Sequence, residues 1–261
     1  LFADVFEIDQ QSFILAVMKP LKYRFAAILN GKTTEDMVAA IKTIVSMVTA
    51  KGFEVQRLEV DPERALVAVK HHLGVPVDTV GAGRHVAIAE RHGRVVKERC
   101  RTVMAGLPYD LAGRFVKYLV MFVVTRLNLL PAAGDGSTLS PRERFTGVKL
   151  LYRRELEIGF GDYAEVWSKP TVSNSMESRT ISAIALYPVG NGQGAWYFYD
   201  IKECTVFQRA QWKVMPCPDI VIRVMNELAR HDKSSLRKGA SAPMSRGTAM
   251  VGELPDRKSV V

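Results

Sequence analysis

The chain has 261 residues, and its hydrophobic content of 48% is enough to fill one large domain or one medium and one small domain. It carries 36 Lys and Arg against 27 Asp and Glu, so its formal net charge is +9, which favours an anionic partner such as nucleic acid. Its three cysteines, Cys100, Cys204 and Cys217, lack paired Cys-x-x-Cys spacing, which argues against a disulfide framework and a structural zinc.

The sequence shows no signal peptide and no membrane-spanning segment. Its longest apolar run, from Phe115 to Leu130, is interrupted by Lys117 and Arg126, so it falls short of the roughly 18–20 clean apolar residues that a span needs. We therefore expect an intracellular protein with no membrane partner. Because the chain begins at Leu1 rather than Met, we also expect it to be a piece of a longer product.

The first third of the chain predicts a strand-led start. Two strands are expected in "VFEIDQQSFILAVM", joined by a tight turn at Gln10-Gln11-Ser12, and a third in "YRFAAILNG". The segment "TTEDMVAAIKTIVSMVTAKG" predicts an amphipathic helix, because it has a capping Thr/Glu start, apolar residues at helical spacing and a glycine stop at Gly52.

Strands and helices then alternate. "FEVQRLEVD" (53–61) predicts a strand, "PERALVAVKHHLG" a short helix that begins at Pro62, and "AIAERHGRVVKERCR" (87–101) a basic helix. A further apolar helix is expected from Asp110 to about Leu129. This order predicts a mixed α/β domain over residues 1–131.

The second half predicts a linker, a β-rich module and a tail. Residues 132–144 are rich in Gly, Pro and Ser and are expected to form the linker. Short strand-like runs separated by turns predict a small β-barrel-like accessory module over residues 145–228. Residues 229–261 predict a basic, disordered tail. In the β-rich module "GNGQG" is expected to be a hairpin turn, and the aromatic residues are expected to be core rather than a base-stacking platform; these are Trp167, Trp196, Tyr197, Phe198 and Trp212.

Three carboxylates lie at ends of predicted elements. Asp9 ends the first strand, Asp61 ends a later strand, and Glu90 lies near the start of a helix. Brought together, they would hold two Mg²⁺ or Mn²⁺ ions about 3.5–4 Å apart, as phosphoryl-transfer enzymes do. Structural alternatives stay open: a solvated turn residue at Asp9, a helix N-cap at Asp61 and a helix-dipole carboxylate at Glu90. Asp4 and Glu7 are neighbours that could take the place of Asp9.

Basic residues follow Glu90 at helical spacing. Arg94, Lys97 and Arg101 stand at +4, +7 and +11, so they share its face of the helix. Such a stripe suits DNA phosphates; a salt-bridged solvated surface is the alternative.

With these residues the chain resembles the integrases of LTR retrotransposons and retroviruses. The resemblance rests on Asp9 in "FEIDQQ", Asp61 in "LEVDPERAL" and Glu90 in "VAIAERHGRVVKERCR". It extends through "LAGRFVKYLVMFVVTRLNLLP", "LSPRERFTG" and "DYAEVW" to the segments that follow the catalytic core in retrotransposon Pol polyproteins, and so covers residues 1 to about 225.

The resemblance implies an RNase H-like mixed sheet with flanking helices and an Asp, Asp, Glu metal site made of Asp9, Asp61 and Glu90. It implies a polynucleotidyl transferase that trims the 3′ end of element DNA and joins it to target DNA with two divalent ions and no small-molecule cofactor. Arg94, Lys97 and Arg101 would contact DNA. A homo-oligomer in the nucleus or in a cytoplasmic virus-like particle is expected. Two alternatives stay open: an inactive nucleic-acid-binding or assembly remnant, and an RNase H-type nuclease.

Overall fold

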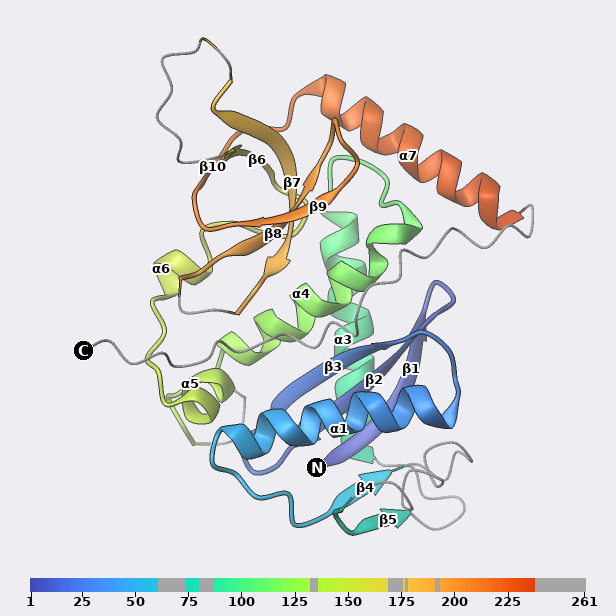
Figure 1. Cartoon of the computed structure of the whole chain (residues 1–261), viewed down its shortest axis with the longest axis vertical. Helices are drawn as coiled ribbons and strands as arrows, with labels where there is room; N and C mark the ends of the chain where they lie inside the picture. Colours follow the sequence, from blue (N-terminus) through green and yellow to red (C-terminus); the bar gives the residue numbers. More distant parts are fainter. Residues whose placement is uncertain are drawn as a thin grey trace. The chain divides into compact units, whose positions relative to one another are not determined.

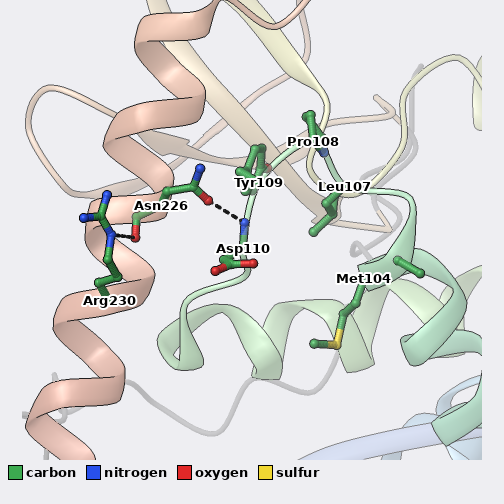
Figure 2. A pocket seen from close by; sticks show the side chains of 8 residues that line it. Met104, Leu107, Pro108, Tyr109, Asp110, Asn226 and Arg230 are labelled. Carbon is green, nitrogen blue, oxygen red and sulfur yellow. Dashed lines mark hydrogen bonds between the residues drawn. The ribbon is translucent and has the colours of Figure 1, made fainter.

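The computed structural model describes residues 1–60, 74–79, 87–131, 136–168, 176, 178–190 and 193–237 (Figure 1). By their internal contacts these residues form two compact units. Unit 1 comprises residues 1–102 and 123–150, and unit 2 comprises residues 103–122 and those after 150. Helices α3 (Ala87–Ala105) and α4 (Val116–Leu129) contribute residues to both units.

Unit 1 is built on a mixed five-stranded sheet. Its strand order is β3-β2-β1-β4-β5, in which β1, β2 and β3 are antiparallel and β4 and β5 continue parallel to β1. The strands are β1 (Phe2–Ile8), β2 (Gln11–Met18), β3 (Tyr23–Leu29), β4 (Leu58–Val60) and β5 (Val77–Thr79). The inner strand β2 is buried from Ser12 to Met18, because both faces of the sheet are covered.

Helix α1 (Thr34–Ala50) covers one face of this sheet and α3 lies on the other (Figure 1). The side chain of Thr33 caps α1 by accepting a hydrogen bond from the amide of Asp36 at 3.2 Å. The apolar face of α1 is fully buried at Met37, Ile41 and Ile44, each worth roughly 1.5–3 kcal/mol of burial. The predicted amphipathic helix is confirmed.

The β1–β2 hairpin turns one residue earlier than expected. Asp9 and Gln10 occupy the turn with φ of 46° and 64°, and Ile8 pairs with Gln11. Positive φ at both central residues is the geometry of a type I′ turn, whose twist matches that of the strands. Asp tolerates this left-handed conformation better than most residues, which gives Asp9 a structural role in the turn.

Other elements differ from expectation in their length. β4 has only three residues, because the backbone of residues 53–57 takes no regular structure. The helix expected at 110–129 begins as the short 3₁₀ helix η2 (Gly113–Phe115) and continues as α4. The helix expected over residues 62–74 lies, apart from Gly74, outside the described residues.

Part of the expected linker is a structured element of unit 1. Helix α5 (Pro141–Thr146) begins with a capping box, in which Ser140 and Glu143 each bind the backbone amide of the other. Phe145 of this helix is buried and stacks on Tyr23 and Phe53, at ring-centroid distances of 4.3 and 5.7 Å. Residues 132–135 lie outside the described part, and the predicted domain boundaries stay a prediction.

Unit 2 contains an antiparallel five-stranded sheet with the order β10-β6-β7-β8-β9. Its strands are β6 (Tyr163–Trp167), β7 (Thr180–Pro188), β8 (Trp196–Asp200), β9 (Val206–Arg209) and β10 (Trp212–Val214). Only residues 210 and 211 separate β9 from β10, although these strands form opposite edges, so the sheet must curl until its edges meet. The Arg209 guanidinium accordingly reaches the carbonyl oxygens of Trp167 and Ser168, on β6 and directly after it. The predicted β-rich, barrel-like module is confirmed.

Two helices complete unit 2, namely α6 (Tyr152–Glu155) and α7 (Asp219–Arg237). The segment from residue 229, which was expected to be a disordered tail, is therefore helical up to Arg237, and residues 238–261 lie outside the described part. No helix in the described part of the chain is both long enough and apolar enough to cross a membrane. The structure confirms the predicted mixed sheet with flanking helices, followed by a β-rich module.

Candidate active site

Asp4 lies where β1 passes the end of β4. The two strands are parallel, and their register pairs Phe2 with Glu59 and Ala3 with Val60. Val60 is the last residue of β4, and Asp4, the next residue of β1, is half-buried. Asp61 follows Val60 in the sequence but lies outside the described residues. One carboxylate of the described sheet is thus held directly beside the end of β4.

Asp9 lies far from that position. It is an exposed residue of the β1–β2 turn, six residues beyond Ala3, which is about 20 Å along a strand that rises roughly 3.3 Å per residue. Figure 1 shows this hairpin at the end of the sheet opposite to β4 and β5. The structure does not bring Asp9 to the end of β4, although the sequence predicted that it shares a metal site there.

Helix α3 covers the face of the sheet that carries Asp4. The Lys97 ammonium lies 5.9 Å from the centre of the Phe6 ring, and Phe6 is two residues from Asp4, so both side chains point to the same face. The Arg24 guanidinium on β3 donates a hydrogen bond to His92 of α3. Arg24 pairs with Val17 and Val17 pairs with Phe2, so Arg24 lies on this same face of the sheet. Along α3, Ala89 and Val96 are fully buried.

These contacts also locate Glu90. Through Arg24, His92 contacts the sheet near its Phe2 end, and Lys97 contacts the sheet at Phe6. Helix α3 therefore runs in the same direction as β1. Glu90 is seven residues before Lys97, so it lies on the same side of the helix, the side toward β1, about two turns nearer its start. Glu90 is therefore placed toward the Asp4 end of β1 and away from the Asp9 turn.

Two of the three basic residues that follow Glu90, Arg94 and Lys97, contact other side chains. Arg94 pairs with Glu90 at 3.2 Å, and the two side chains are 71% and 51% exposed. Lys97 lies over Phe6 as described, and Arg101 is exposed. The alternative interpretation, a salt-bridged surface, thus applies to Glu90 and Arg94 in this structure, and a pair this exposed contributes only about 0.3–0.5 kcal/mol.

A polar cluster near the start of α3 was missed by sequence reasoning. The Arg24 guanidinium donates to His92 Nδ1 at 2.9 Å and to the Leu127 carbonyl at 3.1 Å. The carboxamide of Asn128 pairs with the backbone N–H and C=O of Arg24 at 2.9 and 2.8 Å. Burial lowers the pKa of Arg24 to about 10. Burial and the charges of Arg24, Lys22 and Arg91 lower the pKa of His92 to about 4, so the imidazole is neutral at pH 7 and accepts the hydrogen bond.

The only sequence signal for this cluster was one charged residue in an otherwise apolar strand, "YRFAAIL". Its partners lie 68 and 104 residues away, so no local pattern identifies them.

Within the described residues, no group of three or more His, Cys, Asp and Glu side chains is arranged to hold a metal ion. Strand β1 and helix α3 direct Asp4 and Glu90 to one end of the same sheet face, which Glu59 of β4 shares through its pairing with Phe2. Oxygen ligands of this kind suit Mg²⁺ or Mn²⁺, which bind through one or two carboxylates and retain waters. Asp61, the third carboxylate predicted for this site, is outside the described part.

No family model and no curated protein matches the chain. Among solved structures it is similar to the catalytic core domain of BIV integrase, with 15% identity over 56% of this chain and 92% of that one, at a TM-score of 0.42. Unit 1 is a mixed α/β unit with flanking helices, and most of the β-rich unit follows it along the chain.

Proposed function

We propose that the chain is an integrase core that performs divalent-metal-dependent 3′-end processing and strand transfer of element DNA into target DNA, with Asp4, Asp61 and Glu90 as the metal ligands. The observation that supports this most is the register of β1 against β4. In this register Asp4 directly follows Ala3, the partner of Val60, and Val60 is the last residue of β4. In this proposal Asp4 replaces Asp9, while Asp61 and Glu90 keep the roles that the sequence predicted.

Asp4 lies close to the last residue of β4, which Asp61 follows in the sequence. Consecutive Cα atoms are 3.8 Å apart and paired strands are about 4.8 Å apart, so the Cα atoms of Asp4 and Val60 lie within about 9 Å of each other. Two carboxylates that each extend from their Cα atoms bridge such a gap through a pair of metal ions about 3.5–4 Å apart. Glu90 approaches from α3 over the same face, so three different elements would supply the ligands.

Two Mg²⁺ or Mn²⁺ ions bound there would activate the attacking water or 3′-hydroxyl and neutralise charge on the phosphodiester. The chain's own residues would hold and orient the metal ions. Asp4 would bind them from a rigid strand, and Glu90 from a helix packed on that strand. Because the Glu90–Arg94 pair is exposed and weak, Arg94 can exchange Glu90 for a DNA phosphate when Glu90 binds metal. Lys97 and Arg101 continue the phosphate-binding stripe.

In this proposal the partners are the ends of the element DNA and the target DNA, and the chain works as a homo-oligomer. The β-rich unit would serve as an accessory surface for DNA binding or assembly. The net charge of +9 agrees with a polyanionic partner, since Lys and Arg gain binding free energy by displacing counterions from phosphates. The protein would act in the nucleus or in a virus-like particle.

The test compares four single variants, Asp4→Asn, Asp61→Asn, Glu90→Gln and Asp9→Asn, in strand transfer with Mg²⁺ and with Mn²⁺. We expect the first three to lose activity by at least about 10³-fold, because a lost metal ligand removes several kcal/mol of transition-state stabilisation. Binding of the same DNA, measured by fluorescence anisotropy, should persist. Asp9→Asn is the matched control, because Asn also tolerates the left-handed turn and so keeps the hairpin.

Three results would contradict the proposal in different ways. Loss of activity in Asp9→Asn with retention in Asp4→Asn would return the site to Asp9. A wild-type chain that binds DNA but transfers no strand with either metal would favour the inactive remnant. Cleavage of RNA in an RNA–DNA hybrid, without joining of DNA ends, would favour an RNase H-type nuclease.

A further inference from the structure

We propose that Arg24, His92 and Asn128 form a polar lock that fixes the first turns of α3 against the sheet, and that Arg24 and His92 are therefore positioning residues for Glu90. The lock itself consists of hydrogen bonds within unit 1. Its consequence for catalysis rests on the proposed function.

The lock joins three elements of unit 1 through one residue. From β3, the Arg24 Nε donates to His92 Nδ1 on α3 at 2.9 Å, and its Nη1 donates to the carbonyl of Leu127 on α4 at 3.1 Å. The Asn128 carboxamide closes the edge of β3 by pairing with both backbone polar groups of Arg24, at 2.9 and 2.8 Å. Asn128 is only 3% exposed, so these hydrogen bonds are shielded from water.

The chemistry of this cluster argues for orientation rather than for stability alone. Within the described residues Arg24 forms no ion pair, and its guanidinium donates to an imidazole and to backbone carbonyls. Placing a cation in a partly buried site without a carboxylate costs desolvation free energy that an apolar side chain would not cost. What the guanidinium adds is direction, because its planar fork donates to α3 and α4 at the same time.

Glu90 depends on this lock because, in the part of the chain that the structure describes, few other contacts hold the first turns of α3. Glu90 lies in the first turn, where backbone N–H groups lack intrahelical acceptors and helices fray. The buried residues nearest to it are Ala89 and Gly93, which together contribute a single methyl group to packing. The side-chain contact of Glu90 is with Arg94 of the same helix, so it does not tie Glu90 to the sheet. His92, two residues further on, does so through Arg24.

Three variants test the lock, and one serves as control. Arg24→Lys keeps the charge but not the fork, so it cannot reach both acceptors. His92→Leu removes the acceptor while leaving the contact between Arg24 and Leu127, and His92→Asn returns an acceptor oxygen near the position of Nδ1. Arg99→Lys is the matched control, since Arg99 is exposed on α3 and lies half a turn away from the side of Glu90.

The first readout is amide hydrogen exchange of residues 88–96, compared with that of α1. We expect exchange in this part of α3 to be about tenfold faster in Arg24→Lys and in His92→Leu, which corresponds to one lost hydrogen bond, and to return within about threefold of wild type in His92→Asn. Exchange in α1 and in Arg99→Lys should match wild type. Unchanged exchange in His92→Leu would overturn the lock, and this holds even if Arg24→Lys does not fold.

The second readout is strand transfer, measured as kcat and as the KM for DNA. If Glu90 is positioned by the lock, Arg24→Lys and His92→Leu lower kcat by about tenfold or more at unchanged KM, and His92→Asn recovers it. Faster exchange with an unchanged kcat would overturn the positioning role. If the wild-type chain transfers no strand, the proposed function fails, and the exchange measurement alone decides whether the lock exists.

Discussion

The contact between η2 and α7 in unit 2 gives a stability prediction with a definite size. The Arg114 guanidinium donates to both carboxylate oxygens of Asp232, with its shortest contact at 2.6 Å, and the Arg114 backbone N–H adds a further hydrogen bond at 3.1 Å. Asp232 is 7% exposed, whereas the Arg114 side chain is 42% exposed. Replacing Arg114 by Met removes the guanidinium from a buried carboxylate.

The expected loss lies between two limits. Removing one partner of a fully buried ion pair costs about 3–5 kcal/mol, and an exposed pair is worth about 0–1 kcal/mol. Because Arg114 is partly screened by water, we expect Arg114→Met to lower the free energy of unfolding of unit 2 by about 2 kcal/mol. With an m-value of about 2 kcal/mol/M in urea, the unfolding midpoint falls by about 1 M.

Tryptophan fluorescence measures this change in the right part of the chain. All three tryptophans, Trp167, Trp196 and Trp212, belong to unit 2, so their emission reports its urea unfolding. The matched control is Lys202→Met, which removes an ion pair of 3.8 Å between two exposed neighbours and should shift the midpoint by less than about 0.3 M. If Arg114→Met shifts the midpoint no more than this control does, the buried contact contributes no stability and the reasoning is wrong.

The pH dependence of this contact has a definite sign. Burial by itself raises the pKa of Asp232, but the hydrogen bonds and the charge of Arg114 outweigh it, so its pKa is lower than the ordinary value of 3.8. A carboxyl group with a lowered pKa in the folded state stabilises the fold above its unfolded pKa and loses that effect as the pH falls through the folded value. The difference between wild type and Arg114→Met should therefore be constant near pH 7 and shrink below about pH 4.

Three further substitutions test the folds of the two units. The Glu143 carboxylate accepts hydrogen bonds from the backbone amides of Ser140 and Leu150 at 2.9 and 3.0 Å. Glu143→Gln should therefore destabilise unit 1 by about 2 kcal/mol, measured by thermal unfolding followed by circular dichroism. An unchanged Tm would refute this. Gly161→Ala should lower the urea midpoint of unit 2, since Gly161 has φ of 86° and an added Cβ would meet Leu107, at a combined cost of about 2–4 kcal/mol. Gly52→Ala, with φ of 81° and open space around it, should cost only about 1–2 kcal/mol, and equal losses at the two glycines would show that the Leu107 contact is unimportant.

Elements with a local cause could be predicted from the sequence. Helix α1 carries its own cap at Thr33, an apolar stripe and the terminal Gly52, and these interact within a few residues. The strands of unit 2 were predicted because aromatic and β-branched runs alternate with turn residues. Their closure into a curled sheet also follows from local sequence, since β9 and β10 are separated by only two residues.

Features set by distant partners could not be predicted. Residues 132–144 contain the Gly, Pro and Ser of a linker, yet Phe145 is buried by Tyr23 and Phe53, about a hundred residues earlier in the chain, and this packing makes α5 part of unit 1. The capping box of Ser140 and Glu143 was present in the sequence and is the signal that would have indicated α5. Arg24 and Asn128, which are 104 residues apart, gave no comparable signal.

In the candidate site, strand β1 likewise combines a feature that local sequence predicts with one that depends on a distant partner. Alternation along β1 predicts that Asp4 and Asp9 point to opposite faces, but it does not say which of them is level with β4. That level is set by backbone hydrogen bonds between residues more than fifty positions apart, such as the bond from the Glu59 amide to the Leu1 carbonyl at 2.8 Å. The turn separately accounts for an acidic residue at position 9, because Asp accepts a left-handed backbone. An aspartate in or next to β1 can thus have either of two physical causes. The strand register distinguishes Asp9, which lies in the hairpin turn, from Asp4, which lies beside the end of β4 at the proposed metal site.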